Sequence, residues 1–385
     1  MMQKNLTSIL ICVLFIINFG SAKERSLRIT VSNPLLLDRK SETIAVKLSD
    51  LKAKLSSLDF GRVTVVDAKT KANLLNQVTS DELLFQSDFK SRETKTFLVQ
   101  NGPAQKSKPA SLVDGRFVKP REDYAWENDR IAFRMYGPAM AKDVNNGIDV
   151  WTKRVRYLIV EKWYKGDEDT GAARVSYHID HGEGADFFSV GKTLGAGSCG
   201  IWYNNAVHQP GVFSSYKTVL NGPIRLVFEL TYDTLNVAGK MYKEIKRVTL
   251  DAGQNLNRID VTYFGPNETE ELQFVAGLVK RKSTASKSNE QNAWMSLWGA
   301  TNDDTTNGSL GSGVVMMKSE FVGLTEDKDQ FLMIGKTKPA NTATYYTGAG
   351  WTRSGDFATE DEWTRYLNEF ALRFASPLRV KLSAK

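Results

Sequence analysis

Apolar and polar side chains alternate with a period of two in several separate stretches of this chain, which restricts the fold more than any other feature. The clearest stretches are residues 130–136, 224–231, 258–263 and 378–382. Because successive side chains of a strand point to opposite faces, each stretch predicts a strand with one buried face and one polar face. Turn signals such as Asn221-Gly222-Pro223 separate them. The pattern predicts an all-β fold, a large antiparallel β-sandwich.

One helix is predicted near the C-terminus. Thr359 and Glu362 have the spacing of a capping box, and Pro377 would end the helix. Between them, large apolar residues recur at helical spacing, which indicates packing against the core. The sequence therefore adds a short C-terminal helix to the sandwich, and a second, weaker helix is expected at residues 49–57.

The first residues have the pattern of a secretory signal peptide. Lys4 precedes an apolar run over residues 9–19, and small residues follow up to Ala22. We expect residues 1–22 to be removed and the protein to be exported, with the periplasm as the expected compartment. The apolar run is too short to span a membrane, and no other stretch is apolar enough. Cys12 would leave with the leader, so that Cys199 is expected to be a lone, buried thiol and the fold to need no disulfide.

The remaining chain divides at a polar stretch rich in helix and strand breakers, residues 105–111. We expect residues 23–115 to form an N-terminal β region packed into the main sandwich, and residues 116–385 to form the catalytic sandwich. The formal net charge is +7 over the whole chain, and the basic residues are dispersed. Nucleic-acid binding is not expected, because it usually needs a basic stripe, whereas an acidic small substrate suits this charge.

All three histidines, His178, His181 and His208, fall in one short part of the sequence. Residues 173–177 are expected to form a strand, and Gly182 and Gly184 to open a tight loop after it. Histidine is the usual side chain for moving protons near neutral pH. Two interpretations compete with a purely structural role. Either His178 or His181 is a general acid or base, or a divalent cation such as Zn²⁺ or Ca²⁺ is held by ligands drawn from His178, His181, Asp186 and His208.

A second group of candidates suits a carboxylated sugar. Arg134 and Tyr136 lie on one face of a predicted strand, where a guanidinium can clamp a carboxylate and a phenol can move a proton. Trp151, Lys153 and Arg154 follow, offering a stacking ring and two cations, although both cations cannot face one pocket from a regular strand. Trp202 is a further candidate for stacking against a sugar ring.

Several of these segments resemble an exported family of polysaccharide-degrading Bacteroidetes that was long known only as a domain of unknown function. One branch of that family contains the ulvan oligosaccharide dehydratase of marine flavobacteria. The segments that carry the resemblance are residues 126–130, 134–138, 147–154, 177–186 and 190–195, with Asn33-Pro34-Leu35, Arg39 and Glu42 near the N-terminus. The resemblance covers most of the chain after the leader.

The resemblance implies a galactose-mutarotase-like β-sandwich that removes water from the uronic acid (glucuronic or iduronic) at the non-reducing end of a sulfated, ulvan-type oligosaccharide. The product is a 4,5-unsaturated uronyl residue. Such chemistry needs a cation at the carboxylate, for which Arg134 or Arg154 is suited, or a divalent ion in their place. It needs a base at C5, for which His178 is the first choice and Tyr136 the second. It also needs an acid at the C4 oxygen, for which His208, His181 and Tyr136 remain open.

The remaining candidates, Arg154, Trp151, His181, Lys153 and Trp202, are expected to bind the anionic oligosaccharide. Two other functions stay open at this stage. A polysaccharide lyase would cleave a uronate glycosidic bond by the same β-elimination, and a non-catalytic carbohydrate-binding protein would bind without turnover. No organic cofactor is expected.

Overall fold

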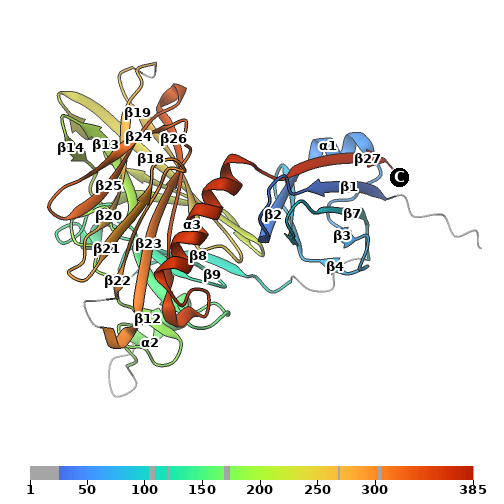
Figure 1. Ribbon diagram of the computed structural model, residues 1–385, viewed down its shortest axis with the longest axis horizontal. Helices are drawn as coiled ribbons and strands as arrows, with labels where there is room; N and C mark the ends of the chain where they lie inside the picture. Colours follow the sequence, from blue (N-terminus) through green and yellow to red (C-terminus); the bar gives the residue numbers. More distant parts are fainter. Residues whose placement is uncertain are drawn as a thin grey trace, which may run out of the picture.

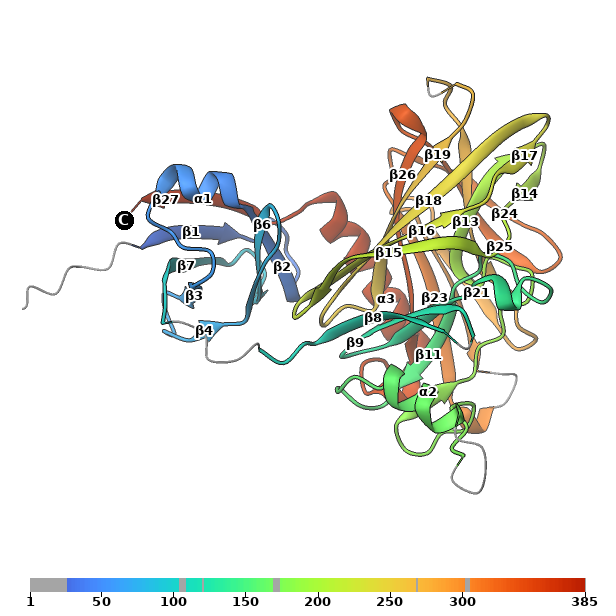
Figure 2. The same ribbon diagram turned by 180° about the vertical axis from the view of Figure 1, so that it is seen from behind.

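The computed structural model describes residues 26–103, 109–119, 121–168, 174–267, 269–301 and 305–384. The expected leader, residues 1–22 with Cys12, lies outside them. The described chain forms a large antiparallel β-sandwich with a smaller β lobe beside it (Figures 1 and 2). The all-β prediction is confirmed. Within the described ranges, no helix has both the length and the apolar character that crossing a membrane requires.

The first layer of the sandwich is a nine-stranded antiparallel sheet. Its strands run in the order β15-β16-β18-β19-β26-β23-β22-β21, and β17 pairs with β18 at one side. The bounds are β15 Phe213–Gly222, β16 Arg225–Tyr232, β17 Leu235–Val237, β18 Lys240–Asp251, β19 Leu256–Phe264, β21 Ala285–Asn289, β22 Trp294–Ala300, β23 Ser309–Met316 and β26 Thr342–Trp351.

The second layer consists of two five-stranded sheets, in the orders β12-β11-β10-β9-β8 and β14-β13-β20-β25-β24. A parallel bridge between Ile148 and Gly195 links them. Their bounds are β8 Val113–Val118, β9 Asp123–Asn128, β10 Ala132–Met135, β11 Asp149–Lys153, β12 Gly184–Asp186, β13 Ala196–Tyr203, β14 Ala206–His208, β20 Gln273–Val279, β24 Phe321–Glu326 and β25 Gln330–Lys336.

The main core lies between the two layers. The alternating residues point into it as predicted: Phe133 and Met135 from β10 meet Leu226 and Phe228 from β16, and all four are buried. Cys199 lies in the same core, 3.7 Å from the Tyr263 hydroxyl. Burial raises the pKa of the Cys199 thiol to about 11, so this side chain serves as a small apolar residue and not as a nucleophile.

The predicted C-terminal helix is confirmed as α3, Glu360–Ala375, which lies on the outer face of the nine-stranded sheet. The Thr359 hydroxyl accepts a hydrogen bond from the Glu362 N–H, as a capping residue does. Trp363 and Leu367 are fully buried against the sheet. The other helices are α1 Leu48–Lys54, which is shorter than expected, α2 Val160–Glu168, and the short 3-10 turns Pro138–Met140, Thr305–Asn307, Pro339–Asn341 and Thr352–Ser354.

The N-terminal lobe has its own apolar core, which includes Ile29, Leu51, Phe85 and Phe97. It contains two antiparallel sheets, ordered β27-β1-β7-β3-β4 and β2-β6-β5. The bounds are β1 Leu27–Ser32, β2 Arg39–Lys47, β3 Val63–Asp67, β4 Asn73–Leu74, β5 Asn76–Val78, β6 Glu82–Phe89, β7 Thr94–Asn101 and β27 Arg379–Ala384.

The C-terminal strand corrects the expected division of the chain. We expected residues 116–385 to form a single catalytic sandwich, but β27 pairs along its whole length with β1 of the N-terminal lobe. The chain leaves the sandwich after α3 and returns to the lobe, as Figure 1 shows. The physical reason is that β1 is otherwise paired on one side only, so β27 satisfies its open edge. The lobe is thus closed by both ends of the described chain.

Candidate functional site

In the five-stranded sheet formed by β8 to β12, the face that points away from the main core is covered by other parts of the protein. The polar residues on this face are therefore shielded from solvent. Helix α2 and the segment 174–183 lie over that face, where Trp151 stacks between Trp163 and Tyr177. Every residue of β10 and β11 is therefore buried, including those that alternation assigns to solvent. A polar side chain on this face must find its partners inside the protein.

Arg134 is the centre of a buried polar network on this face. Its Nε and Nη2 donate to Asp149 Oδ2 over 2.9 and 2.5 Å, and Nη2 also donates to Asp186 Oδ2 over 2.8 Å. Nη1 donates to the Tyr177 hydroxyl over 3.2 Å. Tyr136 donates its own hydroxyl to Asp149 over 2.9 Å. The guanidinium is therefore fully engaged by protein groups.

The network contains more carboxyl groups than cations. Asp123 accepts a hydrogen bond from the Tyr164 hydroxyl over 2.9 Å and lies 3.7 Å from Arg134 Nη1. Burial raises the pKa of Asp123 to about 6, against the pull of Arg134. Burial, and then the charge of Asp149, also raise the pKa of Asp186 well above its usual range. One arginine thus faces three buried carboxyl groups, and the cluster holds protons that exposed aspartates would have lost.

The raised pKa of Asp123 predicts a pH-dependent stability. Its folded-state pKa of about 6 exceeds the ordinary 3.8, so the stability due to the bound proton is present below about pH 4 and is lost as pH rises through 6. Asp123→Asn removes the titrating group. We expect the variant and the wild type to unfold at the same urea concentration at pH 4, and the variant to be more stable by roughly 1–3 kcal/mol at pH 7. A difference that stays constant over this range would contradict the assignment.

His178 lies at the solvent-facing side of this network. Its Nδ1 is 3.3 Å from the backbone oxygen of Asp186 and 3.5 Å from Asp186 Oδ2. Its ring centroid is 4.5 Å from that of Tyr177. The side chain is nevertheless 56% exposed. A proton on Nδ1 shared with the Asp186 oxygens leaves Nε2 as the basic nitrogen, which is the arrangement of a base oriented by a carboxyl group.

The segment around His178 differs from the expected strand. Of residues 173–177, Arg174 to Ser176 have no regular secondary structure and Tyr177 begins a turn, so the strand starts only at Gly184. Asp180 holds this loop by accepting the backbone N–H groups of Gly182 and Gly184. Gly184 has a φ of +117°, and a Cβ there would lie 2.0 Å from the Thr152 oxygen, so the tight loop depends on glycine. The loop thereby fixes the position of His178 against β12.

Arg154 is one of three accessible cations that contact this loop, together with Lys162 at Glu183 and Arg353 at Asp180. Its side chain is 40% exposed, and Nη1 binds Asp180 Oδ2 over 3.1 Å. His181 is exposed on the same loop. The Asp180 side chain is only 7% exposed and also lies 3.7 Å from Arg353 Nη1, so it is the solvent-facing part of the Arg154 guanidinium that a ligand carboxylate can contact. The loop therefore carries two exposed histidines and contacts the exposed cations Arg154, Lys162 and Arg353.

Other predicted contact residues do not reach this surface. Arg134 and Tyr136 are buried and engaged as described above, so neither can touch a substrate. Trp151 is fully buried and cannot serve as a stacking platform. Lys153 is also buried, and its Nζ binds Glu127 Oε2 over 2.6 Å. Each of these predictions assumed that one face of the strand was open to solvent. Helix α2 covers that face, so the assumption is wrong.

His208 and Trp202 lie elsewhere in the sandwich. His208 ends β14, where its Nε2 is 3.2 Å from the Tyr203 backbone oxygen. Trp202 packs against an apolar cluster on the outer face of the other five-stranded sheet. Figure 1 shows β14 and β12 at opposite ends of the sandwich, and Figure 2 shows the same separation between β14 and β11, the strand that β12 pairs with. His208, one of the three candidates for the acid, is therefore not close to His178.

The expected metal ligands are likewise not assembled. Across the parts of the chain that the structure describes, no three His, Cys, Asp or Glu side chains come together in a way that could hold a metal ion. His208 is at the other end of the molecule. Asp186, the expected ligand beside His178, shares the guanidinium of Arg134 with Asp149 instead.

Four members of the network were not predicted as site residues: Asp123, Asp149, Tyr164 and Tyr177. Asp123 and Tyr164 stand in no recognisable motif. Tyr177 directly precedes His178, and that adjacency was the one available signal.

Comparisons with known proteins identify relatives. Residues 31–380 match the family described as "Domain of unknown function (DUF4861)". A protein of Formosa agariphila described as "Uncharacterized protein P7" is 33% identical over 379 residues, which cover 92% of this chain and 93% of that protein. Two solved structures from Enterococcus faecalis also match over 93% of this chain. One is a protein in glycosyl hydrolase family 38 (TM-score 0.49, 9% identity), and the other is an alpha-mannosidase (TM-score 0.43, 7% identity). This chain spans about half the length of each, 47% and 46%.

Proposed function

This chain belongs to the DUF4861 family, and we propose that it is a carbon–oxygen lyase that removes water from the uronic acid at the non-reducing end of ulvan-type anionic oligosaccharides. The product would be a 4,5-unsaturated uronyl end. One observation carries the proposal: His178 is an exposed imidazole whose inner nitrogen faces a buried carboxyl group, itself held by Arg134. That arrangement suits a general base.

The proposed reaction is a β-elimination. Nε2 of His178 takes the proton from C5, the electron pair forms the C4–C5 double bond, and the C4–O bond breaks. The departing oxygen takes a proton from an acid and leaves as water. Negative charge gathers on the substrate carboxylate as C5 loses its proton, and the guanidinium of Arg154 is an accessible group suited to stabilise it. Both proton-transfer groups return to their starting states by exchange with solvent.

The acid is assigned by elimination among the predicted candidates. Tyr136 is buried and donates its proton to Asp149, and burial raises the pKa of its phenol well above the usual range. His208 lies at the other end of the sandwich. His181 remains, exposed on the loop that carries His178. We therefore propose His178 as the base, His181 as the acid and Arg154 as the partner of the carboxylate.

Replacing Arg154 with alanine tests the carboxylate contact. We expect kcat/KM on a uronate-ended disaccharide to fall roughly 10²–10³-fold, the usual cost of removing one donor to developing charge. Arg154→Lys should recover part of that loss, since it keeps the charge but not the bidentate fork. Arg116→Ala is the matched control, because Arg116 is 37% exposed and ion-paired at the other edge of the same sheet. Equal kcat/KM in Arg154→Ala and Arg116→Ala would contradict the role.

Chain length separates the proposed reaction from its alternatives. Both a hydro-lyase and a polysaccharide lyase create the conjugated double bond, so both raise ultraviolet absorbance. Only the polysaccharide lyase shortens the oligosaccharide. We expect absorbance to rise while size-exclusion chromatography shows an unchanged number of sugar residues. Shorter products would favour the polysaccharide lyase, and binding without any rise in absorbance would favour a carbohydrate-binding protein.

A further inference from the structure

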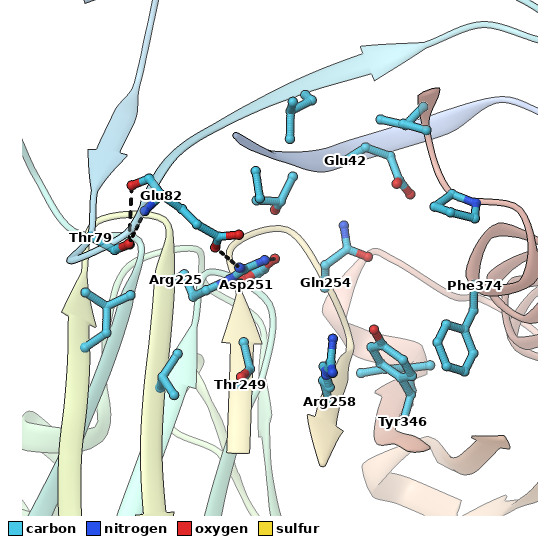
Figure 3. Close-up of a pocket in the computed structure, with 18 of the residues that line it drawn as sticks. Glu42, Thr79, Glu82, Arg225, Thr249, Asp251, Gln254, Arg258, Tyr346 and Phe374 are labelled. Carbon is cyan, nitrogen blue, oxygen red and sulfur yellow. Dashed lines mark hydrogen bonds and ion pairs between the residues drawn. The ribbon is translucent and has the colours of Figure 1, made fainter. Parts of the chain in front are cut away.

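A large cavity lies away from the His178 loop, between the N-terminal lobe and the sandwich. Its volume is about 640 Å³, within the range of small-molecule binding sites. Three parts of the molecule line it: β2 with the turn before β6, the outer face of the nine-stranded sheet, and the segment from the end of α3 to β27. Figure 3 shows Glu42 and Glu82 entering from the lobe, Arg258 and Tyr346 from the sheet, and Phe374 from α3.

The cavity is preformed, because hydrogen bonds and ion pairs join its walls. Gln77 accepts the backbone N–H groups of Ile224 and Arg225 across the lobe boundary. Gln86 donates to the Ala252 oxygen over 2.8 Å. Arg373 at the end of α3 binds Glu42 of β2 over 2.6 Å. A ligand entering such a cavity loses little free energy to ordering the protein.

Fixed ion pairs cover the sheet side of the cavity. Arg225 binds both oxygens of Asp251, over 2.6 and 2.8 Å. Arg258 binds both oxygens of Asp260 in the same way, and its side chain is still 47% exposed. In each pair, the guanidinium N–H donors lie beside the carboxylate acceptors, and the two groups share one plane. Neighbouring hydroxyl groups on a sugar, which both donate and accept, are complementary to such a surface.

An aromatic side chain completes this surface. Tyr346 stands opposite Arg258 in the register of β19 and β26, and Phe374 packs edge-on against its ring at 4.8 Å. The Tyr346 hydroxyl points into the cavity (Figure 3). Rings that expose an apolar face and a polar tip suit the mixed C–H and O–H surface of a sugar.

The charges in the cavity are balanced. Five arginines line it, Arg39, Arg225, Arg247, Arg258 and Arg373, and five carboxylates face them, Glu42, Asp81, Glu82, Asp251 and Asp260. A polyanion such as a nucleic acid would meet no excess of positive charge. We propose that this cavity binds the uncharged part of an oligosaccharide, as a site separate from the His178 loop. The inference goes beyond the proposed hydro-lyase function and does not depend on it.

The test uses the full-length protein with uncharged pentasaccharides of glucose, xylose, mannose and rhamnose, followed by ligand-observed NMR. At least one should bind with a Kd below about 1 mM. Arg258→Ala should weaken that binding roughly tenfold or more, and Tyr346→Phe should weaken it while keeping the ring in place. Arg28→Ala, an exposed arginine on β1 outside the cavity, is the matched control and should bind as the wild type does.

Two further measurements distinguish this proposal from alternative explanations of the cavity. Because the ligand is uncharged, Kd should change less than about twofold between 0.05 and 0.5 M NaCl. Water elimination from a uronate-ended disaccharide should be unchanged in Arg258→Ala. The proposal is overturned if none of the four sugars binds, if Arg258→Ala and Arg28→Ala behave alike, or if binding collapses with salt. Loss of turnover in Arg258→Ala would also overturn it, by making the cavity part of the reacting site.

Discussion

Replacing His178 with alanine is expected to lower kcat for water elimination by roughly 10²–10⁴-fold, the usual contribution of a positioned general base. The substrate would still bind through Arg154, so KM should change far less. His178 is more than half exposed, so the substitution should leave the fold intact, and circular dichroism together with the urea midpoint would verify this. Initial rates on a uronate-ended disaccharide measure the effect.

His208, which lies far from the His178 loop, supplies the control. His208→Ala removes the same type of side chain from the opposite end of the sandwich and should keep wild-type turnover. Its Nε2 lies 3.2 Å from the Tyr203 backbone oxygen and its ring packs edge-on against the Tyr203 ring. If His178→Ala keeps full activity, or if both variants lose it equally, His178 is not the base.

Replacing Arg134 with methionine is expected to destabilise the protein by about 3–5 kcal/mol. Methionine keeps the bulk of the side chain but leaves Asp149 and Asp186 buried without their cation. A loss of this size is a large part of the total stability of a typical domain. Urea-induced unfolding at pH 7, followed by tryptophan fluorescence, measures it.

Arg116→Ala is again the matched control, because it removes an arginine from an exposed ion pair on the same sheet. Its cost should be about 0–1 kcal/mol. Arg134→Met should also recover stability as pH falls, since protonation of the aspartates removes the uncompensated charges. If Arg134→Met and Arg116→Ala have the same urea midpoint, Arg134 does not stabilise the fold through its buried aspartates.

Most of the fold could be predicted because strand alternation depends on local sequence. Leu226, Phe228 and Leu230 point into the core as their spacing requires, and the capping pair Thr359 and Glu362 marks the start of α3. The position of β27 could not be predicted, since the pairing of a strand depends on which edge is open in three dimensions.

The candidate site could be predicted in location but not in the roles of its residues. Histidine composition and family resemblance both led to the segment around His178. Alternation placed Arg134 and Lys153 on a polar face, but it carries no information on what covers that face. Helix α2 is short and carries several charged residues. Its sequence therefore does not indicate that it packs over these cations and buries them. Their role changed from ligand contact to internal support for this reason.

The most direct test of the central claim is mass spectrometry of uronate-ended ulvan oligosaccharides after incubation with the wild-type protein and with His178→Ala. We predict that the wild type lowers the mass of each oligosaccharide by one water without changing the number of sugar residues, and that His178→Ala leaves the masses unchanged over the same time. Unchanged masses with folded wild-type protein, or fragments from cleavage of a glycosidic bond, would contradict the account.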